Sequence, residues 1–360
     1  MRKCIIASLC EQKVHVPVAD SLAVEMGYPA TKPSVFSELA IGTTTDMSDI
    51  KLFRIGQASV SELPTQSPQV EKSLQNLFEG NLEALLGVRF LASEFSTGPV
   101  HGGRIDTLGI DEDGSPVIIE YKRSVNENVI NQGLFYLDWL MDHKKDFLWL
   151  VMDKLGKDVA DKVEWSAPRL ICIAGDFTRY DGHAVKQINR SIELMRYRRF
   201  SDDILMIELI HTPRIATRAP TILDTTTPDI AVPATGGKDP YLSSRIDYRL
   251  SNSTGELRDL WDATSSFLMG LGDDVQLKEL KFYYAFKRIK NFVCLELYPS
   301  AKTVAAYVKV NPDAVSLEDG FTRDVRKIGH FGTGDLEITM RSLDDLAKAQ
   351  PLFQRAYEGG

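Results

Sequence analysis

The residues of this chain with the clearest chemical potential lie in two short stretches joined by a turn. Asp106 ends the sequence Gly-Arg-Ile-Asp, and Glu120 and Lys122 lie in Val-Ile-Ile-Glu-Tyr-Lys. Glu120 follows Asp106 by 14 positions. Side chains alternate along a strand, so Glu120 and Lys122 share a face. The Asp-Gly turn at 113–114 brings Asp106 back beside them. Adjacent carboxylates repel unless they share a cation, and Mg²⁺ accepts carboxylate oxygens, so the spacing predicts a metal site.

The alternative is an ordinary ion pair on a solvent-exposed strand, which contributes only about 0 to 1 kcal/mol. An isolated Glu-x-Lys favours that alternative. Here three apolar residues at 117–119 precede Glu120, and the following helix carries Gln132 and Tyr136 at i, i+4 on one face. Gln132 and Tyr136 by themselves are typical of helix packing. Their place after Glu120-x-Lys122 favours a shared site.

Together these motifs resemble the PD-(D/E)XK, or restriction-endonuclease-like, nuclease superfamily, and more closely its RecB-type and NucS-type branch. The resemblance covers residues 68–210. It implies an α-β-β-β-α-β core in which Asp106 and Glu120 hold Mg²⁺ or Mn²⁺, and Lys122 positions or activates the attacking water. It also implies that Gln132 and Tyr136 orient a substrate phosphate or a water molecule.

The resemblance further implies a catalytic glutamate from the helix before the hairpin. Glu71 fits this role best by position, and Glu79 is the second candidate. NucS-type enzymes carry a substantial amino-terminal β domain for dimerisation, whereas only a short strand pair at 50–63 stands in its place here, so a homodimer is left open. From about residue 250 onward the chain is similar to a small domain of unknown function that is sometimes labelled a predicted transport protein. No apolar run here approaches the roughly 20 residues that span a bilayer, so we expect no membrane association.

Hydrophobic periodicity predicts the elements that position these residues. Apolar residues recur with helical spacing from 71 to 86, and Gly87 follows as a stop signal. We expect strands at 90–95, 104–110, 116–122, 170–174, 192–197 and 204–210, and helices at 126–155 and 184–190. Interleaved helices and apolar strands indicate an α/β fold. Farther on, a helix at 257–271, strands at 280–289, 293–298 and 305–310, and a helix at 343–357 predict a separate small α+β domain.

Changes in composition divide the chain into five parts. They are a weakly structured leader at 1–46, a short β segment at 47–67, the nuclease-like domain at 68–212, a linker rich in proline and threonine at 213–247, and the C-terminal α+β domain at 248–360. The C-terminal domain carries no recognisable chemistry. We interpret it as a unit that could bind a partner protein.

The net charge of −8 excludes indiscriminate coating of nucleic acid, so any contact must come from a local basic face. We expect that contact from Arg104, Arg123, Lys186 and Arg190, of which Lys186 and Arg190 stand at i, i+4; a solvated helix face fits those two equally well. The 4 cysteines are scattered singly without a Cys-x-x-Cys pair, which argues against zinc and against a disulfide framework. We therefore expect a reducing, cytoplasmic environment.

Two functions from different classes are consistent with these residues. The first is a metal-dependent endonuclease that hydrolyses DNA phosphodiester bonds at branched, mismatched or single-stranded sites, in repair or defence. The alternative is a catalytically inactive nuclease-fold module that binds nucleic acid or a partner protein. The joint presence of Asp106, Glu120 and Lys122 favours the enzyme, because a buried carboxylate pair without a metal costs on the order of several kcal/mol. The choice between DNA and RNA stays open.

Overall fold

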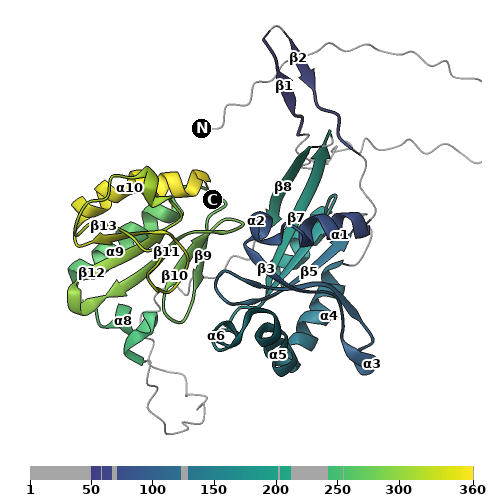
Figure 1. The fold of residues 1–360 in the computed structure, drawn as a ribbon, viewed down its shortest axis with the longest axis horizontal. Helices are drawn as coiled ribbons and strands as arrows, with labels where there is room; N and C mark the ends of the chain where they lie inside the picture. Colours follow the sequence, from purple (N-terminus) through teal and green to yellow (C-terminus); the bar gives the residue numbers. More distant parts are fainter. Residues whose placement is uncertain are drawn as a thin grey trace, which may run out of the picture. The chain divides into compact units, whose positions relative to one another are not determined.

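The computed structural model describes residues 50–57, 59–66, 71–122, 129–201, 203–211, 242–253 and 255–359. The predicted leader at 1–46 and most of the predicted linker lie outside these residues. Asp49–Gly360 forms one compact unit. Within it, the described residues form two six-stranded sheets and a two-stranded ribbon of β1 (Phe53–Ile55) and β2 (Val60–Glu62) (Figure 1).

The first sheet has the strand order β3-β4-β5-β6-β7-β8. Its strands are β3 (Val88–Ser96), β4 (Arg104–Asp111), β5 (Pro116–Lys122), β6 (Arg169–Ala174), β7 (Ser191–Phe200) and β8 (Ile204–His211). β5, β6 and β7 pair in parallel, and the other neighbours pair antiparallel. Parallel neighbours need crossover connections, which explains the helices that separate β5 from β6 and β6 from β7. The result is a mixed α/β arrangement.

Helices cover both faces of this sheet. They are α1 (Glu71–Glu79), α2 (Leu82–Leu86), α3 (Gly98–His101), α4 (Val129–Asp142), α5 (Lys144–Leu155), α6 (Lys157–Ala160) and α7 (Arg179–Lys186). Phe78 of α1 packs in one core with Ile119 of β5, while Leu137 of α4 packs in another with Ile118. β5 is therefore buried on both faces, as its nearly continuous apolar sequence requires, and the predicted alternation of its side chains is confirmed.

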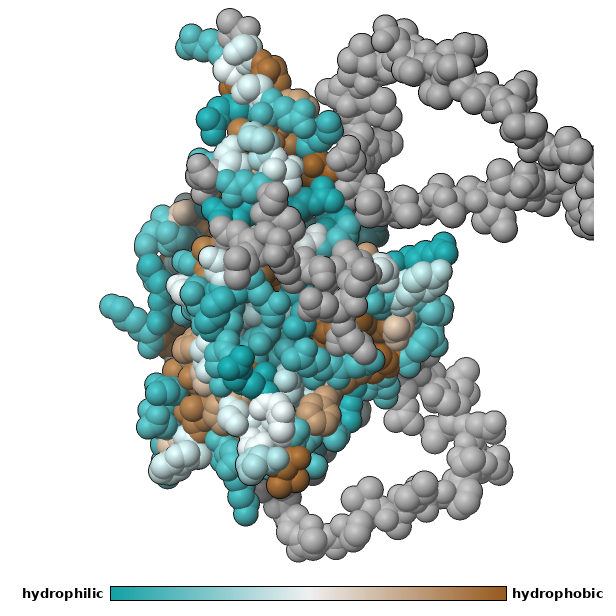
Figure 2. Space-filling model, turned by 90° about the vertical axis from the view of Figure 1, so that its right-hand side faces the viewer, coloured by the Kyte–Doolittle hydropathy of each residue, from teal (hydrophilic) through white to brown (hydrophobic). Residues whose placement is uncertain are grey.

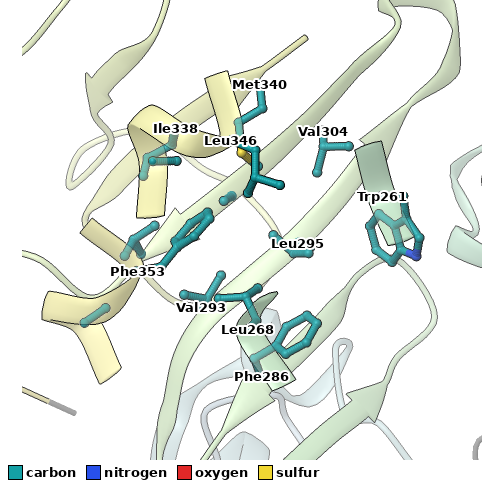
Figure 3. Close-up of a cluster of buried hydrophobic side chains, with 14 of the residues drawn as sticks. Trp261, Leu268, Phe286, Val293, Leu295, Val304, Ile338, Met340, Leu346 and Phe353 are labelled. Carbon is teal, nitrogen blue, oxygen red and sulfur yellow. The ribbon is translucent and has the colours of Figure 1, made fainter. Parts of the chain in front are cut away.

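The second sheet is antiparallel throughout, with the order β13-β14-β12-β11-β10-β9. Its strands are β9 (Gln276–Glu279), β10 (Tyr284–Lys287), β11 (Asn291–Tyr298), β12 (Thr303–Val308), β13 (Thr322–Asp324) and β14 (Leu336–Met340). The accompanying helices are α8 (Ile246–Ser251), α9 (Gly255–Met269) and α10 (Leu343–Gly359). Figure 3 shows Leu268 of α9 and Phe353 of α10 packed with Val293 and Leu295 of β11. The core thus lies between one sheet face and two helices.

Three predicted elements differ from the structure. The strand predicted at 280–289 is shorter in the structure: only β10 lies within that range, and β9 precedes it, because Leu280 N–H donates to the Tyr283 carbonyl and closes a turn between the two strands. The helix predicted at 184–190 is α7, which starts earlier because Thr178 and Asp181 cap each other's backbone N–H groups. The helix predicted at 71–86 is divided into α1 and α2. Gly87 ends α2 as predicted, with a φ of 65° that favours glycine.

The molecular surface is mainly hydrophilic on the face that Figure 2 shows, with hydrophobic residues in small patches. Among the described residues, the β1–β2 ribbon exposes Phe53, Ile55 and Val60. Scattered apolar side chains are normal on a protein surface. These three exposed side chains do not by themselves indicate a binding partner.

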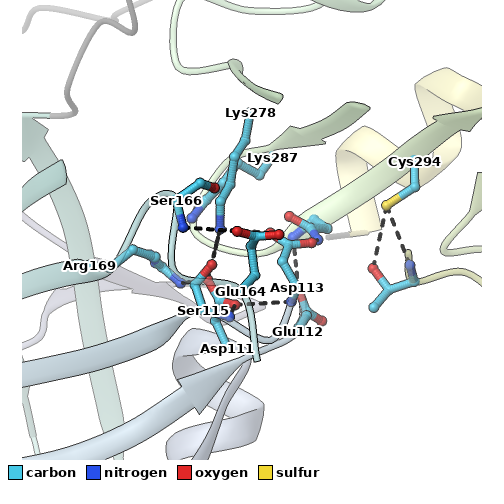
Figure 4. Close-up of polar contacts among 12 residues, drawn as sticks. Asp111, Glu112, Asp113, Ser115, Glu164, Ser166, Arg169, Lys278, Lys287 and Cys294 are labelled. Atoms are coloured by element: carbon cyan, nitrogen blue, oxygen red, sulfur yellow. Dashed lines mark hydrogen bonds and ion pairs between the residues drawn. The ribbon is translucent and has the colours of Figure 1, made fainter. Parts of the chain in front are cut away.

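A buried ionic network connects the β4–β5 turn with the second sheet (Figure 4). Lys278 of β9 donates to Asp111 at 3.2 Å, to Asp113 at 3.1 Å and to Ser115 Oγ at 3.0 Å. Arg169 of β6 also donates to Asp111, at 3.1 Å. Both cations and Asp111 are buried, so the charges compensate one another away from water.

The acids of this network stay ionised because of their partners. Burial alone would raise the pKa of Asp111, but Lys278 and Arg169 lower it to about 2. Glu193 is also lowered to a pKa of about 2, since Arg169 and Lys287 outweigh the effect of burial. Lys287 pairs with Glu193 at 3.6 Å, yet burial and the nearby Arg169 lower its pKa to about 8.

Lys278→Met should therefore lower the free energy of unfolding by about 3 to 5 kcal/mol, because it removes a buried cation from Asp113 and leaves Asp111 with Arg169 alone. The measurement is urea denaturation of the full chain. Lys309→Met is the matched control: Lys309 pairs with Glu112 of the same turn but is 28% exposed, so its loss should cost less than about 1 kcal/mol. Equal losses in the two variants would contradict the role of burial.

Candidate functional site

Asp106 and Glu120 lie at the point where β4 and β5 separate. The ladder between the strands ends at the pair Thr107 and Ile119. Beyond it, Glu120 Oε1 accepts the Asp106 N–H at 3.2 Å. Asp106 Oδ2 accepts the Tyr121 N–H at 3.0 Å. Each carboxylate is therefore held by the backbone of the other strand.

The Glu120 carboxylate is fully buried, and its Oε2 has no hydrogen-bond partner among the described residues. Burial, followed by the neighbouring Asp106 charge, raises the pKa of Glu120 to about 9. Burial also raises the pKa of Asp106, although the Tyr121 N–H and Lys122 act against it. A cation bound between the two carboxylates would remove both penalties.

The donor set fits Mg²⁺ or Mn²⁺. Among the residues that the structure describes, no three His, Cys, Asp or Glu side chains converge as a complete metal cage. Mg²⁺ commonly takes one or two carboxylates and fills its remaining positions with waters and substrate phosphates. Asp106 and Glu120, with the unpartnered Glu120 Oε2, provide such a pair.

Lys122 and Glu71 meet beside the carboxylate pair. Lys122 is the last residue of β5, and its Nζ donates to Glu71 Oε1 at 3.4 Å. Glu71 is the first residue of α1. After burial, the Glu71 charge is one of the groups that raise the pKa of Asp106. The structure thus brings Glu71, Asp106, Glu120 and Lys122 together from α1, β4 and β5.

Glu79, the second candidate for the helix glutamate, has different partners. Its Oε1 accepts from Thr107 Oγ1 at 2.6 Å and from Gln75 Nε2 at 2.9 Å. Glu71 instead contacts Lys122. The geometry favours Glu71 for the site.

Gln132 and Tyr136 form a joined pair on α4. Gln132 Nε2 donates to the Tyr136 hydroxyl at 3.1 Å, and the same oxygen accepts the Arg104 N–H at 3.1 Å. The Tyr136 ring packs so closely on Gly103 that a Cβ there would collide with it. The pair is therefore connected to the start of β4, two residues before Asp106, rather than directly to β5.

The predicted nucleic-acid contacts are in separate places. Arg104 is exposed, and its Nε pairs with Glu94 at 2.5 Å. Arg123 lies outside the described residues. Lys186 ends α7, whereas Arg190 lies in the turn before β7, so the predicted i, i+4 pair on one helix is wrong; both side chains are exposed.

The sequence-based prediction missed three polar residues around the site. Gln75 is buried and donates to the Asp106 carbonyl at 2.8 Å. Lys72 Nζ donates to Glu94 Oε1 at 2.8 Å. Gln75 could have been found from the sequence, because it lies one helical turn after Glu71 and beside the apolar residues Leu74 and Phe78 of α1. Glu94 carries no such signal, because its role depends on its backbone conformation.

Comparisons with known proteins find one family model that matches the C-terminal part of the chain. Residues 247–359 match the model of a domain of unknown function, DUF5655. The chain is 28% identical over 311 residues to an uncharacterized protein of Haemophilus influenzae, covering 86% of this chain and 100% of that protein.

No helix within the described residues is long and apolar enough to cross a membrane.

Two solved structures are similar to part of the chain. One is a repair endonuclease from Pyrococcus abyssi, with 20% identity and a TM-score of 0.23, and the other is a complex of EndoMS with double-stranded DNA, with 22% identity and a TM-score of 0.21. Each match covers 38% of this chain and about half of the solved chain.

Glu120→Gln should stabilise the metal-free protein at pH 8 by roughly 4 to 5 kcal/mol. The pKa of Glu120 rises from 4.5 to about 9 on folding, so its favourable contribution is complete below pH 4.5 and is lost as the pH rises toward 9. Glutamine does not titrate. Melting curves in EDTA at several pH values should show the gap between variant and wild type widening with pH. A difference in melting temperature that stays constant with pH would contradict the raised pKa of Glu120.

The role that the sequence predicts for Gln132, orienting substrate in a nuclease, implies that Gln132→Ala lowers cleavage at least about tenfold without unfolding the protein, because a misplaced substrate costs rate rather than packing. Single-turnover kinetics and melting curves measure the two effects. Gln354→Ala is the matched control, since Gln354 donates to Glu358 in an equivalent i, i+4 pair on α10. A collapse of the melting temperature in Gln132→Ala would instead identify a packing residue.

Proposed function

We propose that this chain is a metal-dependent endonuclease of the PD-(D/E)XK type that hydrolyses DNA phosphodiester bonds. One observation carries the proposal: a fully buried Glu120 has an oxygen without a partner among the described residues, next to the carboxylate of Asp106. A structural carboxylate in such a place would be expected to have a hydrogen bond or a cation. The arrangement is better explained as a prepared metal site.

Asp106 and Glu120 would hold Mg²⁺ or Mn²⁺. The ion, when bound, supplies charge stabilisation at the attacking and leaving oxygens of a phosphodiester. The backbone N–H groups of Asp106 and Tyr121 fix the orientation of the two carboxylates before substrate arrives. The chain thus provides a rigid receptor for the reacting phosphate.

Lys122 would hold the attacking water. Its side chain is 14% exposed, so its Nζ can reach solvent while staying close to Glu71. The 3.4 Å contact with Glu71 is long for a charged hydrogen bond, so a water beside the pair could contact both Lys122 Nζ and Glu71 Oε1. Glu71 Oε1 can then accept a proton from that water.

The remaining residues would handle the substrate. Gln132 and Tyr136 orient a phosphate beside the start of β4, and exposed Arg104 provides positive charge there. We propose that the DNA is cut at branched, mismatched or single-stranded sites. Residues 248–360 would bind a partner protein, and self-association as a homodimer stays a prediction.

The proposal is tested by cleavage assays on single-stranded, duplex, mismatched and branched DNA with Mg²⁺, Mn²⁺ or EDTA. We expect cleavage of at least one substrate with metal and none in EDTA. Binding of these substrates without metal-dependent cleavage of any would overturn the proposal in favour of an inactive binding module.

Lys122→Ala should reduce single-turnover cleavage by two to three powers of ten, as loss of a charged transition-state contact commonly costs about 3 to 4 kcal/mol. Lys122→Arg should also be poor, because a planar guanidinium does not replace a compact ammonium. Binding, measured by fluorescence anisotropy on the same DNA, should weaken much less, since one lysine accounts for about one released counterion. Equal losses in cleavage and binding would argue against a catalytic lysine.

A further inference from the structure

A second charged cluster lies next to the carboxylate pair, and only its Arg104 has been given a role so far, as a source of positive charge for the substrate. It consists of Lys72 of α1, Glu94 of β3 and Arg104 of β4. Glu94 Oε1 accepts from Lys72 Nζ at 2.8 Å, and Glu94 Oε2 pairs with Arg104 Nε at 2.5 Å. One carboxylate therefore holds two cations that come from different elements. We name these three residues the lateral cluster.

The backbone of Glu94 adopts a conformation that a glutamate rarely takes. Its φ is +54°, within a strand whose neighbouring residues pair regularly, Ser93 with Thr107 and Phe95 with Ile105. That register puts Glu94 opposite Asp106. A non-glycine residue in the left-handed region costs energy and persists only where the surroundings impose it, commonly at functional sites.

The exposure of the three side chains fits a receptor for an anion. Lys72 and Arg104 are 51% and 66% exposed, while Glu94 between them is 28% exposed. The cations thus face solvent, and the carboxylate lies behind them. Two cations against one carboxylate leave the lateral cluster with a net positive charge.

The lateral cluster is connected to the candidate active site by hydrogen bonds. Lys72 Nζ donates to Gln75 Oε1 at 3.1 Å, and Gln75 Nε2 donates to the Asp106 carbonyl at 2.8 Å. Arg104 lies two residues before Asp106 on the same strand. A phosphate bound by the cluster would belong to the same nucleic-acid strand as a phosphate at Asp106.

We propose that Lys72 and Arg104 form a binding site for a backbone phosphate adjacent to the one that is cut, and that Glu94 is the positioning residue that holds both cations for it. This inference rests on the proposed nuclease function. An exposed ion pair contributes too little stability to explain a strained backbone. Placing two cations beside the reacting phosphate does explain it.

The first test measures binding of fluorescein-labelled duplex DNA to the full chain in EDTA, as a function of salt. Lys72→Ala and Arg104→Ala should each weaken binding severalfold and reduce the slope of log affinity against log salt by about one. Arg323→Ala is the matched control, because Arg323 is 57% exposed and pairs with Glu337 at 2.6 Å on the second sheet. If Lys72→Ala and Arg104→Ala show the same slope of log affinity against log salt as Arg323→Ala, the proposal that Lys72 and Arg104 bind a phosphate is wrong.

The positioning role is tested by a double-mutant cycle in the same metal-free assay. Lys72→Ala should cost severalfold in affinity in the wild-type background and less than twofold in the Glu94→Gln background, because glutamine no longer holds Lys72 in place. An equal cost in both backgrounds would overturn the role of Glu94. Neither binding experiment requires cleavage, so each remains decisive if the wild type cuts no substrate and the proposed function fails.

A third variant separates positioning from folding. Glu94→Gly relieves the left-handed backbone and should raise the melting temperature, while single-turnover cleavage with Mg²⁺ falls at least about tenfold. A merely structural glutamate would show the opposite: stability would fall with its ion pairs, and cleavage by the folded protein would be unchanged. That result would contradict the proposal.

Discussion

Glu120 lies fully buried at the end of an apolar strand, where one carboxylate oxygen accepts the Asp106 N–H and the other has no partner among the described residues. Much of the surrounding structure compensates for this one group. The separation of β4 and β5 makes room for its side chain, Gln75 satisfies the Asp106 carbonyl that the ladder leaves free, and Lys122 adds a positive charge. None of these contacts reaches Glu120 Oε2, and the proposed metal ion would supply the missing partner.

The local part of this arrangement could be predicted from the sequence because it depends on neighbours in the chain. Strand alternation and the Asp-Gly turn were sufficient to place Asp106 and Glu120 on adjacent strands. The break between α1 and α2 falls at Gly80 and Asn81, a signal that the prediction of one continuous helix overlooked. The left-handed backbone of Glu94 could not be predicted, because no local sequence signal marks it. The ionic partners of the β4–β5 turn could not be predicted either, because Lys278 and Asp111 are 167 positions apart in the sequence.

The β4–β5 hairpin is fixed at both ends by different means. At its turn, Asp111 and Asp113 are held by Lys278 in a buried network, and at its open end Asp106 and Glu120 are held by backbone N–H groups. Asp111 lies five positions after Asp106 on β4, about 17 Å along an extended strand. A hairpin anchored at one end by charge can keep its other end in register for chemistry. The second sheet would then contribute to the site without touching it.

The order of synthesis gives this anchoring a further consequence. Asp111 leaves the ribosome 167 positions before Lys278, an interval of about 10 to 30 seconds at roughly 5 to 20 residues per second. During that time Asp111 has its backbone donors and Arg169 but not Lys278, and Asp113 lacks both Lys278 and Tyr283. The buried ion pairs of Lys278 with Asp111 and Asp113 can therefore form only after β9 has been synthesised.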